Sequence, residues 1–377
     1  MENPFIYGHL NDISEFVNRS ADIERLRQNI ENKINTILLS PRRWGKSSLV
    51  KVLEKKSGLP KKYVFCHIDM FNFKSDEDFY YHFSNAILHS TSSKFDELVT
   101  NMKEYLSSLT PTISLEYGGL GKISFDFSSS EGEQSFMDIL NLPEKIAKKK
   151  NIRLVVCIDE FQNLSRFKDP LLFQQRLRAS WQHHQHVTYI LYGSKRSMLS
   201  TIFEKQSMPF YKFGDVLYLK KIEASHWISY IQRRFRRSDK KISKKFAVKI
   251  TELMECHTYY VLQFAHILWN NTEEQVDEKI FEKSTTDIIE RNSLLYETVF
   301  ENLSVNQIKV LIMLAENPKG KFTGAKLIKK YDLGTSSNVI QAMNALEFKE
   351  IIDRFEGYPM FIDPVFRLWM NVRVLKK

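Results

Sequence analysis

The chain has 377 residues, of which 43% are hydrophobic and 27% charged, and its formal net charge is +10. A chain of this length is too long to fold around one ordinary hydrophobic core, so we expect about two to three domains. The composition excludes a membrane-spanning protein, because no run approaches the roughly 18 apolar residues that a membrane helix needs. The start of the chain also lacks the basic and apolar segments of a secretory leader, so we expect a cytoplasmic protein without a membrane partner.

The chain opens with an extended segment and one helix. The extended segment is expected at 5–8, and the stretch with Phe16, Val17 and Arg19 follows it. Apolar residues then recur at helical spacing at positions 23, 26 and 30. This helix leads the chain into a short buried strand at 37–39.

A phosphate-binding signature follows that strand. The pattern G-x-x-x-x-G-K-[ST] is present as S-P-R-R-W-G-K-S, with Ser40 in place of the first glycine. In such a loop the backbone amides surround the phosphates, the lysine (Lys46) reaches the β and γ oxygens, and the hydroxyl (Ser47) binds Mg²⁺. A surface turn that carries a lysine by chance is less favoured, because a strand precedes the loop and a helix follows it. The residues expected around the phosphates are Ser40, Pro41, Arg42, Arg43, Trp44, Gly45, Lys46, Ser47 and Ser48.

A second strand at 63–69 and a helix at about 76–90 repeat the order of strand and helix. This order predicts an α/β fold in which helices cover both faces of a parallel sheet. From about 107 to 132 the order is interrupted by two alternating segments around the glycines at 118–121. These segments predict a β-hairpin inserted into the domain.

An uninterrupted apolar strand at 153–158 ends in Asp159 and Glu160. In a parallel sheet the carboxyl ends of the strands form the edge where ligands bind. We expect Asp159 to bind Mg²⁺, directly or through water, and Glu160 to orient and polarise the attacking water. An acidic pair after a strand more often caps a helix, but the phosphate-binding loop upstream favours the catalytic interpretation.

The next apolar strand, at 187–192, is followed by a glycine and then by Ser194, Lys195 and Arg196. We expect Ser194 to sense the γ-phosphate from the same edge of the sheet. Lys195 and Arg196 are weaker candidates for neutralising charge, since solvation at the surface explains them equally well. Residues 216–219 predict a fifth strand that closes the sheet.

Residues 224–296 are helical in pattern and predict a helical lid. They include a basic patch at 233–245, which has two interpretations. It is either the solvated face of a helix whose apolar face holds Trp227, Ile231 and Phe235, or a contact for nucleic acid. The solvated helix is the favoured interpretation.

Residues 297–377 predict a winged helix, with three helices that begin after Ser304, Thr323 and Ser336 as N-caps, followed by a hairpin. If this domain reads DNA, the helix at 336–348 enters the major groove. That helix carries polar residues but no Arg or Lys, whereas phosphate contacts normally supply most of the affinity for DNA. A protein-interaction or packing module is the alternative.

In order and spacing, these motifs resemble the archaeal-type ATPases of the STAND branch of the AAA+ superfamily, in particular the bacterial ATP-binding proteins built in the same way. The resemblance implies a P-loop nucleotide-binding domain at 1–222, a helical lid at 223–296 and a winged helix at 297–377. Its carriers are NPF at 3–5, FVNR at 16–19, SPRRWGKSSL at 40–49, CIDEFQ at 157–162, YGSKRSML at 192–199, PFY at 209–211, HTYY at 257–260 and IDPVFRLW at 362–369.

The resemblance further implies that Phe16, Val17 and Arg19 lie near the adenine and that the turn at 257–259 presents the lid to the phosphates. It implies a switch or motor driven by ATP and Mg²⁺. Two other functions are kept beside this ATPase: a DNA-binding protein regulated by ATP, and a nucleotide-gated protein scaffold with little turnover. The candidate partners are nucleic acid, bound by the winged helix or by the patch at 233–245, a second protein, and further copies of the chain.

Overall fold

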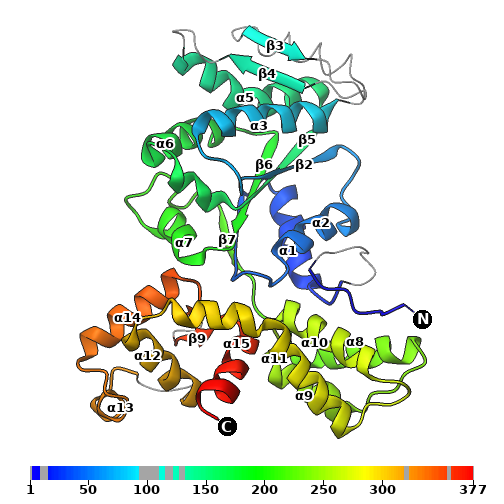
Figure 1. The fold of residues 1–377 in the computed structure, drawn as a ribbon. Helices are drawn as coiled ribbons and strands as arrows, with labels where there is room; N and C mark the ends of the chain where they lie inside the picture. Colours follow the sequence, from blue (N-terminus) through cyan, green and yellow to red (C-terminus); the bar gives the residue numbers. More distant parts are fainter. Residues whose placement is uncertain are drawn as a thin grey trace. The chain divides into compact units, whose positions relative to one another are not determined.

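The computed structural model describes residues 2–8, 16–92, 110–114, 122–126, 132–317, 322–354 and 358–376. The chain forms two compact units (Figure 1). The sheet unit comprises Arg19–Ser40 and Lys46–Lys220, and the C-terminal unit comprises Met1–Asn18, Pro41–Gly45 and Lys221–Lys377. The tip of the predicted phosphate loop therefore groups with the C-terminal helices, although both of its ends belong to the sheet unit.

Five parallel strands form the centre of the sheet unit, in the order β2-β5-β6-β1-β7. This arrangement confirms the predicted parallel sheet, because strands that alternate with helices along the chain pair in the same direction. Their bounds are β1 Thr36–Leu39, β2 Tyr63–Asp69, β5 Arg153–Asp159, β6 Val187–Gly193 and β7 Asp215–Tyr218.

Helices cover both faces of this sheet. Ile37 and Leu39 belong to an aromatic-rich core, to which α3, α5, α6 and α7 also contribute side chains. Leu38 lies between them in sequence, is also buried, and faces the other side of the sheet. Figure 1 shows α3 beside α5, and α1 packs against α2. The helices are α1 Ser20–Glu31, α2 Lys46–Lys56, α3 Asp76–Thr91, α5 Gly132–Lys150, the 3-10 helix η2 Phe161–Arg166, α6 Pro170–Trp181 and α7 Arg196–Glu204.

The predicted insertion contains two antiparallel strands, β3 Thr110–Ser114 and β4 Lys122–Asp126. Ile113 pairs with Ile123 in their register. The strands of the hairpin are thus confirmed, and the glycine turn at 118–121 lies outside the described residues.

The C-terminal unit is mainly helical. Its buried core combines Phe5 and Val17 from the start of the chain with residues between Ile222 and Met370. Within it α8 packs on α9, α10 on α11, and α12 on α14. None of the helices in the described part of the chain is long and apolar enough to cross a membrane. The elements are α8 Ala224–Arg237, α9 Lys244–Leu253, α10 Thr258–Asn271, α11 Glu278–Glu301, α12 Val305–Glu316, α13 Ala325–Lys330, α14 Ser336–Phe348, β8 Ile352–Asp353, β9 Met360–Phe361, α15 Pro364–Trp369 and the π-helix η3 Met370–Val374.

The predicted N-caps of the last three helices are partly wrong. Ser304 caps α12 as predicted, in a capping box with Gln307. The N-cap residue of α13 is Gly324, one position later than predicted. The cap of α14 is Thr335, whose hydroxyl accepts a hydrogen bond from the Asn338 amide at 3.2 Å and so takes the role expected of Ser336.

Candidate nucleotide site

The carboxyl ends of four neighbouring strands meet at one edge of the sheet. Leu39 of β1 pairs with Gly193 of β6, and Asp69 of β2 pairs with Asp159 of β5. The phosphate loop, the acidic pair and Ser194 therefore follow strands that end at the same level. This edge is where open parallel sheets bind their ligands.

The phosphate loop joins β1 to α2, which begins at Lys46. Gly45 has φ of 95°, a left-handed conformation that glycine adopts without steric cost, and Arg43 is left-handed as well, with φ of 64°. The Lys46 side chain is buried, and its ammonium donates a hydrogen bond to the Ser40 carbonyl at 3.2 Å. The side chain of Lys46 thus folds over the loop toward Ser40. Its charge lies near the start of α2, where anions are favoured.

Ser47 and Asp159, the two predicted metal ligands, lie in direct contact. The Ser47 hydroxyl donates to Asp159 Oδ2 at 2.7 Å, and the Glu160 amide donates to Asp159 Oδ1 at 2.8 Å. Burial raises the pKa of the Asp159 carboxyl, and the hydrogen bond from Ser47 opposes that shift. A hydroxyl and a carboxylate side by side form a donor set that suits Mg²⁺, which prefers oxygen ligands.

Glu160 lies at the turn between β5 and η2 in a left-handed conformation, with φ of 52°. This conformation is uncommon for a residue other than glycine and costs about 1–3 kcal/mol, a type of strain that concentrates at functional sites. Its Oε2 accepts a hydrogen bond from the Ser194 hydroxyl at 3.0 Å and another from the Gln162 side-chain amide. The structure therefore brings Ser194 to Glu160, and the role of Ser194 as a γ-phosphate sensor stays a prediction.

Sequence reasoning assigned no role to three residues at this edge: Gln162, Gly193 and Asp69. Gln162 is only 1% exposed and contacts Glu160 directly. Two polar residues, Gln162 and Asn163, between the apolar residues of the sequence F-Q-N-L were the available signal. Asp69, the last residue of β2, is exposed and lies beside Asp159 in the strand register.

The tip of the phosphate loop packs within the C-terminal unit. The Trp44 carbonyl accepts a hydrogen bond from the Thr258 hydroxyl at 3.4 Å, and the Arg43 guanidinium lies 4.4 Å from the centre of the Tyr259 ring. Arg42 forms an ion pair of 3.2 Å with Glu350, which follows α14. The predicted lid turn at 257–259 therefore contacts the phosphate loop.

The residues predicted near the adenine lie before α1. Val17 and Arg19 are buried, and Phe16 is half-buried. The Arg19 guanidinium donates to the Lys220 carbonyl at 2.6 Å and lies 3.3 Å from Asp22. Burial lowers the pKa of Arg19, and Asp22 opposes the shift. The role of these residues at adenine stays a prediction.

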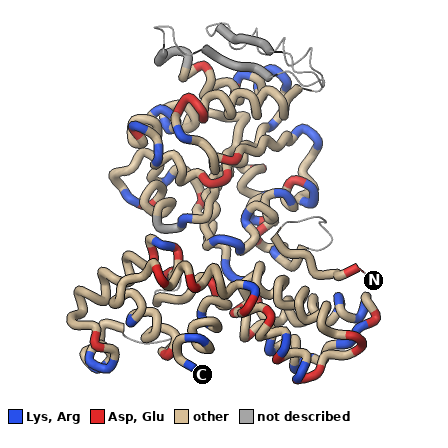
Figure 2. Tube along the Cα trace, viewed as in Figure 1, with Lys and Arg blue, Asp and Glu red and all other residues tan. Residues whose placement is uncertain are grey.

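The basic patch at 233–245 belongs to α8, to α9 and to the connection between them. Trp227, Ile231 and Phe235 are buried on its inner side, as the interpretation of a solvated helix requires. Lys240 donates to the Trp269 carbonyl at 2.9 Å, and Lys245 pairs with Glu278 at 3.3 Å. Figure 2 shows Asp and Glu among the Lys and Arg of this region. The fold itself therefore engages part of the positive charge.

Lys195 and Arg196 were the weaker charge-neutralising candidates. Lys195 occupies the N-cap position of α7 without a capping hydrogen bond from its side chain. The side chain of Arg196 lies outside the described residues. Neither role is tested, and both stay predictions.

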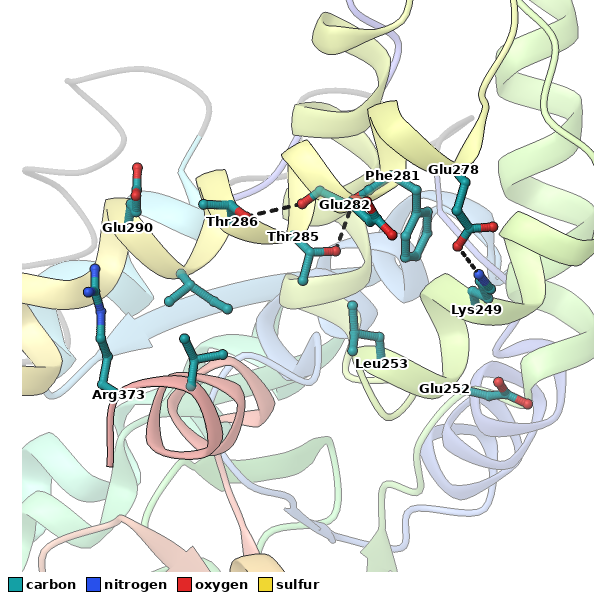
Figure 3. A pocket seen from close by; sticks show the side chains of 12 residues that line it. Lys249, Glu252, Leu253, Glu278, Phe281, Glu282, Thr285, Thr286, Glu290 and Arg373 are labelled. Carbon is teal, nitrogen blue, oxygen red and sulfur yellow. Dashed lines mark hydrogen bonds and ion pairs between the residues drawn. The ribbon is translucent and has the colours of Figure 1, made fainter. Parts of the chain in front are cut away.

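A separate pocket of about 570 Å³ lies between α9, α11 and η3 (Figure 3). Leu253, Phe281 and Ile289 are among its apolar lining residues, and Lys249 pairs with Glu278 at its rim. The Thr285 hydroxyl donates to the Phe281 carbonyl at 2.9 Å, so its polar group is satisfied within α11. Among the described lining residues, none belongs to the predicted nucleotide site.

Comparisons with known proteins agree with this geometry. Residues 43–222 match the KAP family P-loop domain, and residues 294–372 match a family described as a "probable winged helix domain". The chain therefore contains a P-loop NTPase domain that matches the KAP family model, followed by a C-terminal winged helix domain. No curated protein matches this P-loop NTPase.

Two solved structures share its fold over almost their whole length. The Walker-type ATPase PABY2304 of Pyrococcus abyssi is 16% identical, with a TM-score of 0.68 and coverage of 98% of this chain and 99% of that one. The ORC2 protein of Aeropyrum pernix, solved as ADPNP and ADP complexes, is 16% identical, with a TM-score of 0.56 and coverage of 98% and 95%. The predicted resemblance to P-loop ATPases with a winged helix is confirmed, while the assignment to the STAND branch stays a prediction.

Proposed function

We propose that this P-loop NTPase binds ATP with Mg²⁺ and hydrolyses it. One observation carries the proposal: the Ser47 hydroxyl lies 2.7 Å from the Asp159 carboxylate, directly before Glu160, whose backbone is left-handed and whose carboxylate accepts two side-chain hydrogen bonds. A hydroxyl at the start of a helix beside a carboxylate at a strand end matches the donors that Mg²⁺ takes in nucleotide sites.

Each residue then has a distinct role. Gly45 and the amides around it surround the phosphates, and Lys46 exchanges its bond to the Ser40 carbonyl for phosphate oxygens. Ser47 and Asp159 hold Mg²⁺, which neutralises phosphate charge when it is bound. Glu160 orients and polarises the attacking water, as a carboxylate within hydrogen-bonding reach of it can.

The same loop supports a role as a nucleotide-driven switch. Arg42, Arg43 and Trp44 lie between the glycine-bearing end of the loop and Ser40, and they contact α10 and the turn after α14. A loop that closes around phosphates changes the direction of these side chains. Bound nucleotide therefore biases the contacts that the C-terminal helices make with the loop.

The test is Mg²⁺-dependent phosphate release from ATP by the wild type and two variants, with nucleotide binding measured for each. We expect Glu160→Gln to bind ATP normally and to lose about 10²–10⁴-fold in kcat. Lys46→Ala should scarcely bind, and chelation of Mg²⁺ should abolish release by the wild type. A wild type that binds ATP without turnover would contradict the ATPase and favour the nucleotide-gated scaffold.

DNA binding regulated by ATP is a second candidate, supported by the winged helix and the net charge of +10. The exposed apolar residues of α14 favour a protein partner over DNA. Ile340 and Phe348 on that helix are 46% and 83% exposed, while the nearby Lys349 donates to the Asn302 carbonyl at 2.7 Å. We therefore expect binding to random duplex DNA to show a shallow salt dependence, whereas several phosphate contacts would give a steep one.

A further inference from the structure

Gln162 lies beside the proposed catalytic carboxylate but takes no part in binding phosphate or metal. We propose that Gln162 is a positioning residue, which fixes the Glu160 carboxylate for attack by water. This inference rests on the proposed hydrolysis and deepens it. The side-chain amide of Gln162 donates to Glu160 Oε2, the same oxygen that accepts the Ser194 hydroxyl.

The residues on either side of Gln162 are anchored. Phe161 is fully buried, with its ring 5.6 Å from that of Phe203 and 5.5 Å from that of Phe210. The Asn163 side-chain amide donates to the Met70 carbonyl at 3.1 Å. Because η2 is held on both sides of Gln162, the backbone that carries this side chain is fixed beside Glu160.

Gly193 provides the space that Gln162 occupies. A Cβ atom at Gly193 would lie 1.9 Å from Gln162 Oε1 and 3.3 Å from the Glu160 Cα. Such a contact is impossible without displacement, and the atom that can move is the end of the Gln162 side chain. We therefore expect a side chain at Gly193, the last residue of β6, to displace the Gln162 amide and so weaken its hydrogen bond to Glu160.

The hydrogen bonds of Gln162 fit a positioning role better than a purely structural one. Its Oε1 is buried and has no hydrogen-bond partner among the described residues, which costs stability, so a site shaped for stability alone would favour an apolar side chain. In the described part of the chain both donors to Glu160 meet Oε2. Holding one oxygen of a flexible glutamate gives the other oxygen a fixed direction, and preorganisation of this kind lowers the barrier for a bound water.

The test compares Gln162→Met with a matched control, Gln174→Met. Methionine keeps the volume and removes the amide. Gln174 on α6 is also buried, and its Oε1 likewise has no partner in the described part of the chain. Its amide donates to the Pro170 carbonyl at 3.1 Å, and none of the hydrogen bonds of the described residues joins it to Glu160. We measure kcat at saturating ATP and Mg²⁺, the affinity for ATP, and thermal stability for both variants.

We expect Gln162→Met to lose about 10-fold in kcat, part of the 10²–10⁴-fold that a positioned base supplies, with its affinity for ATP unchanged within about twofold. Gln174→Met should keep the wild-type kcat. Gly193→Ala should reproduce the loss, and the double variant with Gln162→Met should be no slower than the slower single variant, because both changes remove the same contact.

Three results would overturn the inference: an unchanged kcat in Gln162→Met, an equal loss in Gln174→Met, or additive losses in the double variant. Each of these leaves the proposed ATPase intact. Absence of hydrolysis by the wild type, in contrast, overturns the proposed function and the inference together.

Discussion

Glu160 in the sheet unit and Asp363 in the C-terminal unit are both half-buried carboxylates that accept two side-chain hydrogen bonds, yet they differ in one respect. Both oxygens of Asp363 are used. Oδ1 accepts the amides of Val365 and Phe366 at 2.8 and 3.0 Å, and Oδ2 accepts the hydroxyls of Tyr260 and Tyr296. Among the described residues, the donors to Glu160 all meet Oε2.

This difference separates a structural carboxylate from a chemical one. Asp363 caps α15 and joins it to α10 and α11, so all its acceptor capacity is used inside the protein. Glu160 is anchored through one oxygen and lies at the edge of the sheet where ligands bind. We infer that a carboxylate satisfied on one side only is prepared for a reactant, whereas one satisfied on both sides holds the fold together.

The largest expected effect on stability comes from Asp363→Ala. The substitution removes a helix cap and leaves the hydroxyls of Tyr260 and Tyr296 without their acceptor. We expect a loss of about 3 kcal/mol in the free energy of unfolding, measured by denaturant titration. Asp363→Asn, which keeps an acceptor oxygen, should lose less than half as much. Equal losses in the two variants would show that the hydrogen bonds do not stabilise this cluster.

An intermediate effect is expected from acid, through His257 at the start of α10. Burial, with the charges of Lys221 and Arg43, lowers the pKa of His257 to about 3, and its ring lies 4.8 Å from that of Tyr260. The pKa of histidine in the unfolded chain is about 6.5, so the unfolded state takes up a proton at a higher pH than the folded state does. The contribution of His257 to stability is therefore complete above pH 6.5 and is lost progressively as the pH falls toward 3. Between pH 7 and pH 5 the wild type should lose about 2 kcal/mol more than His257→Asn.

His184 in the sheet unit provides the comparison for this acid effect. Burial lowers its pKa to about 4, and its Nδ1 lies 2.9 Å from the Tyr189 hydroxyl. His184→Gln should reduce the acid sensitivity of the sheet unit without altering that of the C-terminal unit. If His257→Asn is as acid-sensitive as the wild type, His257 is not the group whose protonation loosens the C-terminal unit.

The smallest effect is expected from Glu350→Gln, which removes the charge that pairs with Arg42. The Arg42 side chain is 51% exposed, so water screens the pair. We expect a change below about 1 kcal/mol in the free energy of unfolding, measured at low and at high salt. A larger change would mean that the turn after α14 depends on the phosphate loop for its stability.

Local sequence patterns determined much of the fold and part of the site. The loop from Ser40 to Ser47, the strand that ends in Asp159 and Glu160, and the winged helix were all recognisable. Each depends on residues close together in sequence, through glycine conformation, strand and helix periodicity, and capping. The order of strand and helix then placed the acidic pair at the same edge as the loop, since parallel strands end together.

Contacts between distant residues were decided only by the tertiary structure. Ser194 reaches Glu160 across 34 residues, Tyr260 reaches Asp363 across 103, and Thr258 reaches the Trp44 carbonyl across 214. No local pattern encodes these pairs, because a hydroxyl or an amide acquires its partner only when separate strands and helices pack together. For the same reason Gly193 has no distinctive signal in sequence, because it supplies space for Gln162, which follows another strand. Gln162 donates to Glu160 only two residues before it, but this contact depends on the left-handed turn that brings the two side chains together.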